Sequence, residues 1–452
     1  MGRLFGTDGI RGVANELLTC ERALTVGRAT ANVLLPKNKG KKQKILIGMD
    51  TRLSSAMLAS ALASGICSVG IDVEILGVVP TPAVAYLVRK YGAAAGIMIS
   101  ASHNSAEFNG IKIFNSEGYK LADELEERIE SVVLENTPPA TVADALDLGN
   151  IVISNTAVGD YVEYVKATTS VRFDGLEIAI DCANGSSSAT AEQLFTSLGA
   201  KCHMLHDKPD GLNINRDCGS THMESLRDYV IAHRLDAGLA FDGDADRFLC
   251  VDNNGTIIDG DVIMAVMALD MKSRGALKHN TVVGTIMTNF GFNKFCEENG
   301  IGFVATKVGD RYVLEQMLLE DFSFGGEQSG HLIMREYSTT GDGQLTAVQL
   351  LSSIVRADRK LSELSAVMKK YPQTMKNIKV SAEAKLAMFT DETVKAILDE
   401  AKARIGETGR LVVRPSGTEP LVRIMAEGED EELIREVVED CATRVEKALL
   451  AY

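Results

Sequence analysis

The stretch KILIGMD, residues 44–50, sets the pattern of the fold. Its apolar run is short enough for a buried strand, and a helical pattern follows it over residues 54–69. Gly70 then offers the left-handed conformation that closes a helix, and IDVEILG (71–77) is a second apolar run. A strand, a helix and another strand in this order predict a βαβ unit.

The same order returns twice along the chain. LEIAIDCANG (176–185) and TVVGTIMTN (281–289) each lead through a helical pattern and a glycine to a further strand, AKCHMLH (200–206) and IGFVATK (301–307). We therefore predict three related α/β domains produced by an internal triplication.

A fourth and smaller unit follows Pro372, which breaks the preceding helix. It contains two strands around one loop, a helix over 391–406 and a terminal helix over 430–448, which is typical of a small α+β domain. The predicted domains are residues 1–155, 156–257, 258–370 and 371–452.

Composition limits the classes of protein that remain. The 452 residues are 45% hydrophobic and 24% charged, which is typical of a globular protein, and no apolar run reaches the length of a membrane span. The first fifteen residues carry charge and glycine where a signal peptide would be apolar. A net charge of -15 argues against a nucleic-acid partner. We expect a cytoplasmic protein without membrane attachment, and the sequence leaves a homodimer open.

Cysteine and histidine give no local metal signature. None of the eight cysteines forms a C-x-x-C pair, so neither a zinc knuckle nor a dithiol site is predicted, and a reducing compartment fits best. His203 and His206 lie on a predicted strand at an unsuitable spacing, and we expect both to be structural.

The strongest chemical signal is AGLAFDGDADRFLCVD (237–252), in which Asp242, Asp244 and Asp246 alternate after an apolar strand. Three neighbouring carboxylates repel one another unless a cation joins them, and oxygen ligands suit Mg²⁺. This pattern favours a metal site over a solvated acidic turn. Arg247 adds a positive charge that could face a phosphoryl group.

Three further loops carry polar groups. RPSGTEP (414–420) offers an arginine fork and hydroxyls for phosphate, although a Pro-Gly hairpin fits it equally well. FGGEQSGH (324–331) brings a carboxylate and a hydroxyl, which suit neighbouring sugar hydroxyls. GTDGIRG (6–12) places an arginine among three glycines, and Lys307 belongs to a weaker loop of the same kind.

The stretch ISASHNSAEFNGIKIF (99–114) leaves a strand through Ser102 and His103 and returns to an apolar run that carries Lys112. Strand ends are where open α/β sheets bind ligands. A phosphoryl group on Ser102 would lie near the aspartate-bound cation, and His103 and Lys112 would steady its charge or move protons. A serine that only caps a turn is the plain alternative, but it leaves the other loops unexplained.

In this order the motifs resemble those of the α-D-phosphohexomutases, over essentially the whole chain. ISASHNS resembles the family's phosphoserine loop, DGDADR its Mg²⁺ loop, GGEQSGH its sugar loop and RPSGTEP its phosphate loop. The resemblance implies three similar α/β domains with mixed sheets and a smaller C-terminal α+β domain around a central active-site cleft. FGTDGIRG (5–12), the segment 181–222 and Gln328 are most similar to members that act on glucosamine phosphates.

The resemblance assigns a role to each matching position. Ser102 would be the phosphorylated serine and, with Asp242, Asp244 and Asp246, would hold Mg²⁺. The groups implied near proton transfer and phosphate are Arg11, His103, Lys112, Arg247 and His331, and the general base is left open among them. The implied substrate ligands are Lys307, Glu327, Ser329, Arg414, Ser416, Gly417, Thr418 and Arg423, the last five for the phosphate that is not transferred.

Two positions depart from the family pattern. Ser105 stands where proline is usual and could loosen the serine loop, and Ala245 stands where glycine is usual, which we expect to be tolerable if its φ is negative. Neither change removes a chemical group.

The implied activity interconverts glucosamine 6-phosphate and glucosamine 1-phosphate through a phosphoserine enzyme and a 1,6-bisphosphate. Glucose or glucosamine 1,6-bisphosphate would prime the enzyme, and the product would enter amino-sugar nucleotide and cell-wall precursor synthesis. Three alternatives stay open. They are the same chemistry on glucose or mannose phosphate, an aspartyl-phosphate phosphatase that uses Asp242, and an inactive sugar-phosphate binder.

Overall fold

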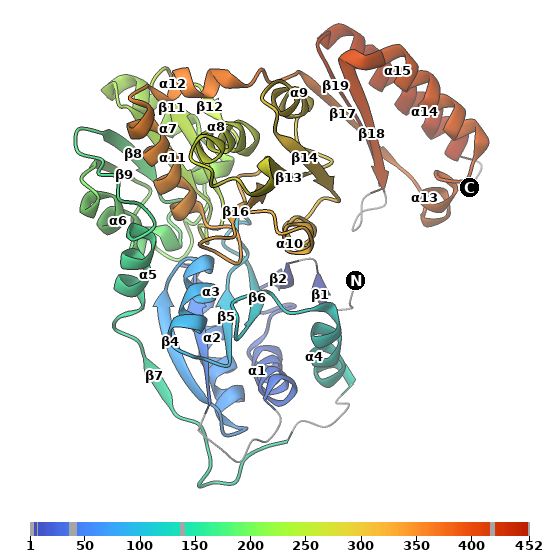
Figure 1. Cartoon of the computed structure of the whole chain (residues 1–452). Helices are drawn as coiled ribbons and strands as arrows, with labels where there is room; N and C mark the ends of the chain where they lie inside the picture. The colour runs from blue at the N-terminus through green and yellow to red at the C-terminus, as the bar shows by residue number, and fades with distance from the viewer. Residues whose placement is uncertain (1–3, 7, 36–42, 136–140, 416–420, 451–452) are drawn as a thin grey trace. The chain divides into compact units, whose positions relative to one another are not determined.

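The structure is a computed structural model that describes residues 4–6, 8–35, 43–135, 141–415 and 421–450 (Figure 1). The chain forms two compact units. The first comprises residues 1–285 and 306–366, and the second comprises residues 286–305 and 367–452.

A seven-stranded mixed sheet with the order β1-β2-β6-β5-β3-β4-β7 begins the first unit (Figure 1). Its strands are β1 (Phe5–Gly6), β2 (Gly9–Val13), β3 (Lys44–Met49), β4 (Asp72–Val78), β5 (Ala95–Ile99), β6 (Phe108–Asn115) and β7 (Ile151–Ile153). β3 pairs in parallel with both β4 and β5, whereas β6 is antiparallel to β5. The βαβ unit predicted around residues 44–77 is therefore confirmed.

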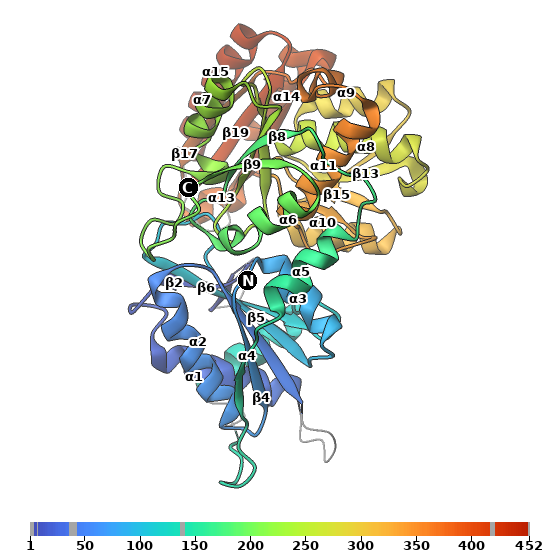
Figure 2. The same cartoon turned by 90° about the vertical axis from the view of Figure 1, so that its left-hand side faces the viewer.

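Alternation along the strands gives this sheet two covered faces. The helices are α1 (Cys20–Leu34), α2 (Leu53–Cys67), α3 (Thr81–Lys90) and α4 (Asp123–Glu135). Ile45 and Ile47 of β3 point to one face and share a core with α1, α2 and α4. Gly48, the next residue along β3, points to the opposite face, toward Val84 of α3. Figure 2 shows α1 and α2 on one side of β5 and α3 on the other.

A second mixed sheet has the order β12-β11-β10-β8-β9. Its strands are β8 (Glu177–Asp181), β9 (Lys201–Leu205), β10 (Ala237–Phe241), β11 (Phe248–Asp252) and β12 (Ile257–Ile258). The accompanying helices are α5 (Ala157–Lys166), α6 (Ala191–Ser197), α7 (Glu224–His233) and the short 3-10 turns η1 (Ser186–Ala189) and η2 (Gly219–Thr221). β8 pairs in parallel with β9 and β10, and β11 is antiparallel to β10.

The rest of the first unit repeats the same theme. Its elements are α8 (Gly260–Ser273), η3 (Lys278–Asn280), β13 (Thr281–Thr285), α10 (Asp310–Leu319), β15 (Phe324–Gly326), β16 (Leu332–Met334), α11 (Gly343–Ala357) and α12 (Leu361–Leu364). β15 is parallel to β13 and antiparallel to β16.

Three equivalent loops follow from this repetition. β5, β10 and β15 are buried parallel strands, and each is followed by an antiparallel neighbour. The loop after β5 carries Ser102, the loop after β10 carries the three aspartates, and the loop after β15 carries Glu327 to His331. The repeated topology thus places three predicted motifs at the same point of three similar sheets.

The second unit contains a three-stranded antiparallel sheet with the order β17-β19-β18. Its elements are α9 (Phe290–Glu298), most of β14 (Gly302–Thr306), β17 (Gln373–Lys379), α13 (Ala382–Ala387), α14 (Glu392–Ile405), η5 (Gly406–Thr408), β18 (Gly409–Pro415), β19 (Leu421–Gly428) and α15 (Glu431–Leu449). Ile424 of β19 packs with Ile397 of α14 and Val438 of α15 in one apolar core. The small α+β domain is confirmed.

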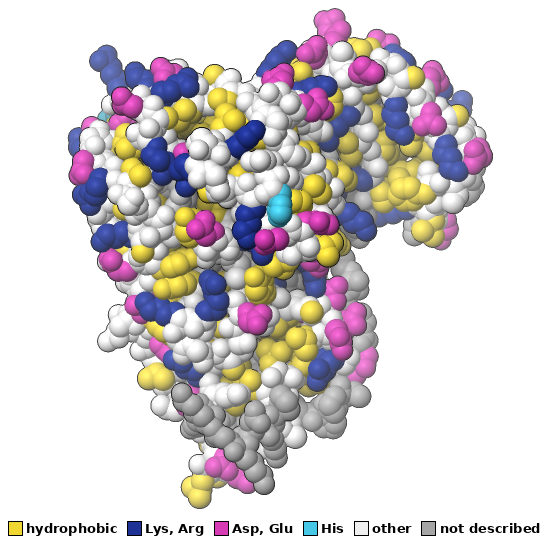
Figure 3. All heavy atoms as spheres, in the orientation of Figure 1, with side chains coloured by type: hydrophobic (Ala, Val, Ile, Leu, Met, Phe, Trp, Pro, Cys, Tyr) yellow, Lys and Arg dark blue, Asp and Glu magenta, His cyan; other side chains and the backbone are white. Residues whose placement is uncertain are grey.

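Charge on the surface is mixed in sign. Figure 3 shows basic and acidic side chains interspersed over the visible face rather than gathered by sign. Among the described residues, no helix is both long and apolar enough to cross a membrane.

Candidate active site

Ser102 lies at the start of the loop that joins β5 to β6, and its side chain is buried. Its backbone has a φ of 52°, a left-handed conformation that turns the chain sharply out of the strand. The Oγ atom donates a hydrogen bond of 2.5 Å to Oδ2 of Asp242, which follows β10. Two motifs that are 140 positions apart in the sequence therefore meet at one contact.

A buried arginine holds the serine loop in place. Arg52 donates to the backbone oxygens of Ser102 (3.0 Å) and Asn104 (2.8 Å), and also to that of Ser105. Its guanidinium is fixed by an ion pair of 2.8 Å with Asp50. Arg52 thus constrains the loop at the position where Ser105, in place of the usual proline, could loosen it. Sequence reasoning missed Arg52, which no local motif marks.

Asp242, Asp244 and Asp246 are all buried, and each offers a carboxylate oxygen within 4.8 Å of the others. Burial, reinforced by the charges of Asp246 and Asp244, raises the pKa of Asp242 well above its ordinary value. Oδ1 of Asp244 and Oδ1 of Asp246 are buried and accept no hydrogen bond within the described ranges. Buried oxygens that lack donors are what a hard divalent cation requires, so these residues fit Mg²⁺.

Ala245 lies between two of these aspartates with a φ of 54°. The condition under which we expected an alanine to be tolerable, a negative φ, is not met, because the loop adopts the left-handed conformation that a glycine takes up freely. An alanine in this region costs roughly 1–2 kcal/mol. The residue is fully buried, and its backbone oxygen accepts a hydrogen bond from the N–H of Gly343. The surrounding fold therefore imposes the conformation.

Lys112 provides positive charge beneath the aspartates. Its Nζ atom, on β6, is 2.8 Å from Asp244, 3.3 Å from Asp246 and 3.2 Å from Asp8. Although burial opposes it, the charges of Asp244 and Asp8 hold the pKa of Lys112 well above its ordinary value. Lys112 is therefore an ammonium group at neutral pH. It can donate a proton, but it has no free lone pair with which to act as a base.

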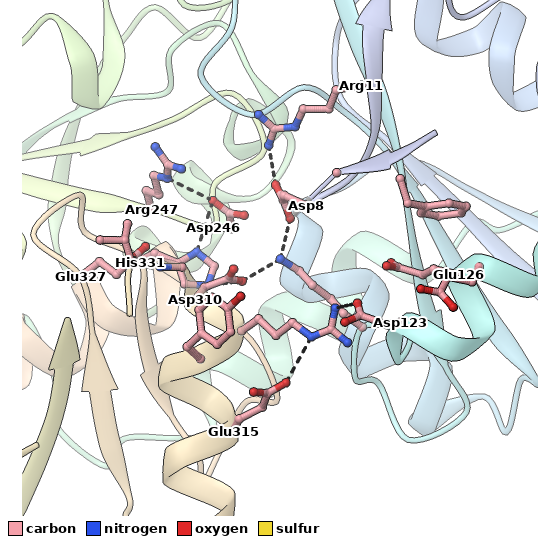
Figure 4. Close-up of a pocket in the computed structure, with 18 of the residues that line it drawn as sticks. Asp8, Arg11, Asp123, Glu126, Asp246, Arg247, Asp310, Glu315, Glu327 and His331 are labelled. Atoms are coloured by element: carbon pink, nitrogen blue, oxygen red, sulfur yellow. Dashed lines mark hydrogen bonds and ion pairs between the residues drawn. The ribbon is translucent and has the colours of Figure 1, made fainter. Parts of the chain in front are cut away.

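A chain of partly buried ion pairs extends the site (Figure 4). Asp8 contacts Arg11, and its other oxygen is 2.5 Å from Nζ of Lys120. The same ammonium is 2.7 Å from Asp310 at the start of α10. Asp8 was part of the predicted N-terminal loop, whereas Lys120 and Asp310 were missed because no sequence pattern connects them.

His331 and Glu327 reach this network from the loop after β15. Nδ1 of His331 is 3.7 Å from Asp246, and Nε2 accepts a hydrogen bond of 3.1 Å from the N–H of Gly341. Nε2 is also 3.4 Å from Oδ2 of Asp310, and although burial opposes it, the charges of Asp246 and Asp310 raise the pKa of His331 above its ordinary value. Glu327 accepts a hydrogen bond of 3.0 Å from the N–H of Gly309. The buried hydroxyl of Ser329 has no hydrogen-bond partner in the described part of the chain.

His103 and Arg247 form a second pair beside the aspartates. Nη1 of Arg247 is 3.2 Å from Nδ1 of His103. Burial, followed by the positive charges of Arg247 and Arg11, lowers the pKa of His103 to about 4. His103 is therefore a neutral imidazole at physiological pH.

Part of this cluster, including Asp246, Arg247 and His331, borders a cavity of about 560 Å³, the size of many small-molecule sites. Its described lining includes four basic residues, Arg11, Lys120, Arg247 and Arg311, and nine carboxylates, Asp8, Asp123, Glu126, Glu127, Glu130, Asp246, Asp310, Glu315 and Glu327. Figure 4 shows Arg247 and Asp246 at the upper left, Asp123 and Glu126 on the right and Glu315 at the bottom. The cavity combines anion-binding groups with an excess of negative charge.

The remaining predicted residues are Lys307 in the first unit and five residues in or next to the C-terminal loop. The side chain of Lys307 is exposed, and its ammonium lies 5.9 Å from the ring centre of Tyr312. Arg414 and Arg423 belong to the second unit, where they are direct partners on β18 and β19. Burial and the charge of Arg423 lower the pKa of Arg414. Ser416, Gly417 and Thr418 lie outside the described residues.

Four family models match successive parts of the chain. They are described as phosphoglucomutase/phosphomannomutase alpha/beta/alpha domains I, II and III and the C-terminal domain, over residues 2–139, 159–255, 259–371 and 375–444. The chain belongs to the phosphoglucomutase/phosphomannomutase family. As a member of this family it is a phosphohexomutase, with three α/β domains and a smaller C-terminal domain. The predicted family and fold class are thereby confirmed.

Relatives of high identity extend over the full length of this family member. It is 50% identical over 449 residues to the phosphoglucosamine mutase of Acetivibrio thermocellus, which covers 99% of this chain and 100% of the relative. The phosphoglucosamine mutase of Clostridium tetani is 50% identical over 447 residues and 99% of each chain.

Solved structures share the fold at low identity. A phosphoglucomutase/phosphomannomutase family protein from Burkholderia thailandensis has a TM-score of 0.83 at 22% identity, over 99% of this chain and 97% of its own. The N-acetylphosphoglucosamine mutase of Aspergillus fumigatus, solved with GlcNAc-6P and magnesium, has a TM-score of 0.68 at 17% identity, over 99% and 96%.

Proposed function

We propose that this phosphohexomutase interconverts glucosamine 6-phosphate and glucosamine 1-phosphate through a phosphoserine at Ser102 and a 1,6-bisphosphate intermediate. The names of the relatives at 50% identity support the substrate. The observation that carries the chemistry is the hydrogen bond of 2.5 Å between Oγ of Ser102 and Asp242 in a buried acidic cluster. A phosphoryl group on this oxygen would enter the cluster directly.

The proposed reaction exchanges one phosphate ester for another. O1 of glucosamine 6-phosphate attacks the phosphorus of phospho-Ser102, a P–O1 bond forms, and the bond between phosphorus and Oγ breaks. The proton of the O1 hydroxyl leaves the sugar, and a proton is returned to Oγ. After the sugar turns round, Oγ attacks the 6-phosphoryl group in the same way and releases glucosamine 1-phosphate. A 1,6-bisphosphate of glucose or glucosamine would prime an unphosphorylated enzyme.

Mg²⁺ would be held by Asp242, Asp244 and Asp246 together with an oxygen of phospho-Ser102. The two buried carboxylate oxygens without donors support this assignment. When bound, the cation supplies charge neutralisation at the phosphoryl group. The side chains then divide the remaining work. The ammonium of Lys112 and the guanidinium of Arg247 stabilise charge, whereas the neutral imidazole of His103 can accept a hydrogen bond or a proton.

The carboxylate excess of the cavity supports an amino sugar as substrate. A glucosamine phosphate carries a phosphate group, which suits Arg11 and Arg247, and an ammonium group, which suits carboxylates. Glu327 and Ser329, from the sugar loop, are our candidates for the ligands of the ring substituents. Glucose or mannose phosphate, which offer a neutral hydroxyl at the same position, would gain nothing from the extra negative charge.

The second unit contributes a candidate phosphate site of its own. Two like charges directly opposite each other in an antiparallel sheet repel one another, so Arg414 and Arg423 favour an anion between their guanidinium groups. We propose that they bind a phosphate of the substrate, with Lys307 as a weaker candidate.

The proposed domains remain residues 1–155, 156–257, 258–370 and 371–452.

A homodimer formed through β7 is a further proposal. β7 is the last strand of its sheet, and Ile151, Val152 and Ile153 are all exposed. An edge strand can pair with its own copy in antiparallel fashion, which satisfies a two-fold axis and covers the apolar side chains. Sedimentation velocity should find a dimer that Val152→Lys dissociates, and a monomeric native protein would contradict the proposal.

The function is tested with a substrate panel. Glucosamine, glucose and mannose 6-phosphates are supplied with Mg²⁺ and glucose 1,6-bisphosphate, and each 1-phosphate product is measured. The highest kcat/KM is expected for glucosamine 6-phosphate.

The mechanism is tested with two serine variants. Ser102→Ala should abolish turnover. Ser105 is an exposed serine of the same loop, and Ser105→Ala should retain turnover. Peptide mass spectrometry should find the phosphoryl group on residue 102, and an active Ser102→Ala enzyme would contradict the mechanism.

A further inference from the structure

A second cluster of metal-binding side chains lies in the second sheet, outside the aspartate cluster. Asp181, His206 and Cys218 each offer one ligand atom, and these three atoms lie within 4.8 Å of one another. Asp181 and Cys218 are fully buried, and the side chain of His206 is 31% exposed. A carboxylate, an imidazole and a thiol thus converge at a point that solvent can reach from one side.

The sheet explains how these residues meet. Asp181 is the last residue of β8, and its register partner on the parallel strand β9 is Leu205, directly before His206. The two chains therefore leave the sheet at the same edge. The segment that follows His206 returns to this edge at Cys218, directly before η2. The residues are distant in sequence, which is why no local motif predicted the cluster.

Backbone hydrogen bonds fix the carboxylate of Asp181, and the ring nitrogen Nδ1 of His206 lies against that carboxylate. Oδ1 of Asp181 accepts the N–H of Ala183 at 2.8 Å, and Oδ2 accepts the N–H of Gly219 at 3.0 Å. Nδ1 of His206 is buried and 3.0 Å from Oδ2 of Asp181, yet it makes no aligned hydrogen bond within the described ranges. Sγ of Cys218 has one weak donor, the side-chain amide of Asn184 at 3.9 Å.

We propose that Asp181, His206 and Cys218 form a binding site for Zn²⁺. Zinc takes tetrahedral nitrogen, sulfur and oxygen ligands at about 2.0–2.3 Å, which places ligand atoms roughly 3.3–3.8 Å apart. The three ligand atoms lie within 4.8 Å of one another, so they would have to move only slightly to reach that spacing. A thiolate ligand selects Zn²⁺ over Mg²⁺, which prefers oxygen alone. Water would complete the coordination on the exposed side of His206. This proposal departs from the expectation that His206 is structural.

The site would act by positioning and would take no part in the chemistry. It closes the base of the loop over residues 207–217, and that loop carries Asn215. The side-chain amide of Asn215 donates hydrogen bonds of 2.9 Å to the backbone oxygens of both Ser102 and Asn104. An ion at the base of the loop would therefore brace the serine loop from the second sheet. This inference does not depend on the identity of the sugar substrate or on the phosphoserine mechanism.

Zinc binding is measured on the full chain after treatment with a chelator. Excess Mg²⁺ keeps the aspartate cluster occupied while Zn²⁺ is titrated in competition with a chromophoric chelator. The native protein should bind one equivalent, and Cys218→Ser and His206→Asn should lose this binding. Cys202→Ser and His203→Gln are matched controls from β9 and should keep it. Binding of less than one equivalent, or binding that both cluster variants retain, would overturn the proposal.

A spectroscopic measurement covers the case in which a variant does not fold. Co²⁺ bound by the native protein should show a thiolate-to-cobalt charge-transfer absorption, which Cys202→Ser should retain. Zn²⁺ should also raise the Tm of the native protein in excess Mg²⁺. Absence of the charge-transfer band in the native protein would mean that Asp181 and His206 form only an ion pair with a bystander thiol, and the proposal would be wrong.

Discussion

The two ligand clusters of the second sheet are stabilised in different ways. Asp242, Asp244 and Asp246 are buried together, and their charge is opposed by side chains of other elements, above all Lys112. The other cluster holds a single carboxylate, that of Asp181, which two backbone N–H groups fix. The first arrangement depends on long-range charge balance, whereas the second depends on local backbone geometry. Changes in charge should therefore disturb the first cluster far more than the second.

Replacement of Lys112 is the largest test of this difference. Lys112→Met removes the ammonium group that contacts Asp8, Asp244 and Asp246 and leaves their buried carboxylates without it. Loss of one partner of a buried ion pair costs about 3–5 kcal/mol. We expect a loss of this size in the free energy of unfolding, measured by chemical denaturation in a chelator. Added Mg²⁺ should restore more stability to the variant than to the native protein.

Lys90 offers a matched control for this substitution. It also pairs with an aspartate, Asp160, at 2.7 Å, but its side chain is 37% exposed. Exposed pairs contribute about 0–1 kcal/mol, so Lys90→Met should change stability little. If Lys112→Met lowered the free energy of unfolding no more than Lys90→Met does, charge balance would not be what stabilises the aspartate cluster.

The contrast also explains what the sequence could predict. The aspartates alternate within five positions, so their spacing alone indicated a metal site, and the strand before Ser102 indicated a ligand loop. The fold class followed from the repeated βαβ pattern. Arg52, Lys120 and the Asp181 cluster could not be predicted, because their partners are brought together only by the tertiary fold. The φ of Ala245 could not be predicted for the same reason, since its conformation is imposed by contacts outside the loop.

A substitution at Asn215 tests whether the two clusters communicate. Asn215→Asp preserves size and the left-handed conformation at φ 57° but replaces the amide that donates to Ser102 and Asn104 with an acceptor. Both backbone oxygens keep Arg52 as a donor, but the new carboxylate oxygen would face them without a proton to share. A disturbance of about 1–3 kcal/mol corresponds to a loss of kcat of roughly fivefold to a hundredfold if the serine loop shifts. KM should change less, because the cavity lining is untouched.

Asn213→Asp is the control, since that amide donates to Lys208 of its own loop and does not reach the serine loop. Equal kinetic effects of the two substitutions would indicate a general disturbance of the loop. A normal kcat in Asn215→Asp would show that the second cluster has no influence on Ser102.

Glu126 provides the smallest test, because it separates burial from charge balance. Burial, only partly offset by Arg311, raises the pKa of Glu126 to about 7, whereas nearby cations hold the pKa of the more deeply buried Asp246 below its ordinary value. The folded protein therefore binds a proton at Glu126 between its ordinary pKa near 4.5 and 7, where the unfolded chain has lost it. The contribution of this group to stability is complete at pH 4.5 and falls as pH rises to 7.

Glu126→Gln has a side chain that stays neutral at every pH. It should raise the Tm relative to the native protein at pH 8 and change the Tm little at pH 5. Glu124→Gln, an exposed position on the same helix, should show no such pH dependence. Equal Tm differences for Glu126→Gln at both pH values would mean that Glu126 is already matched by cations in the cavity, as Asp246 is in the cluster.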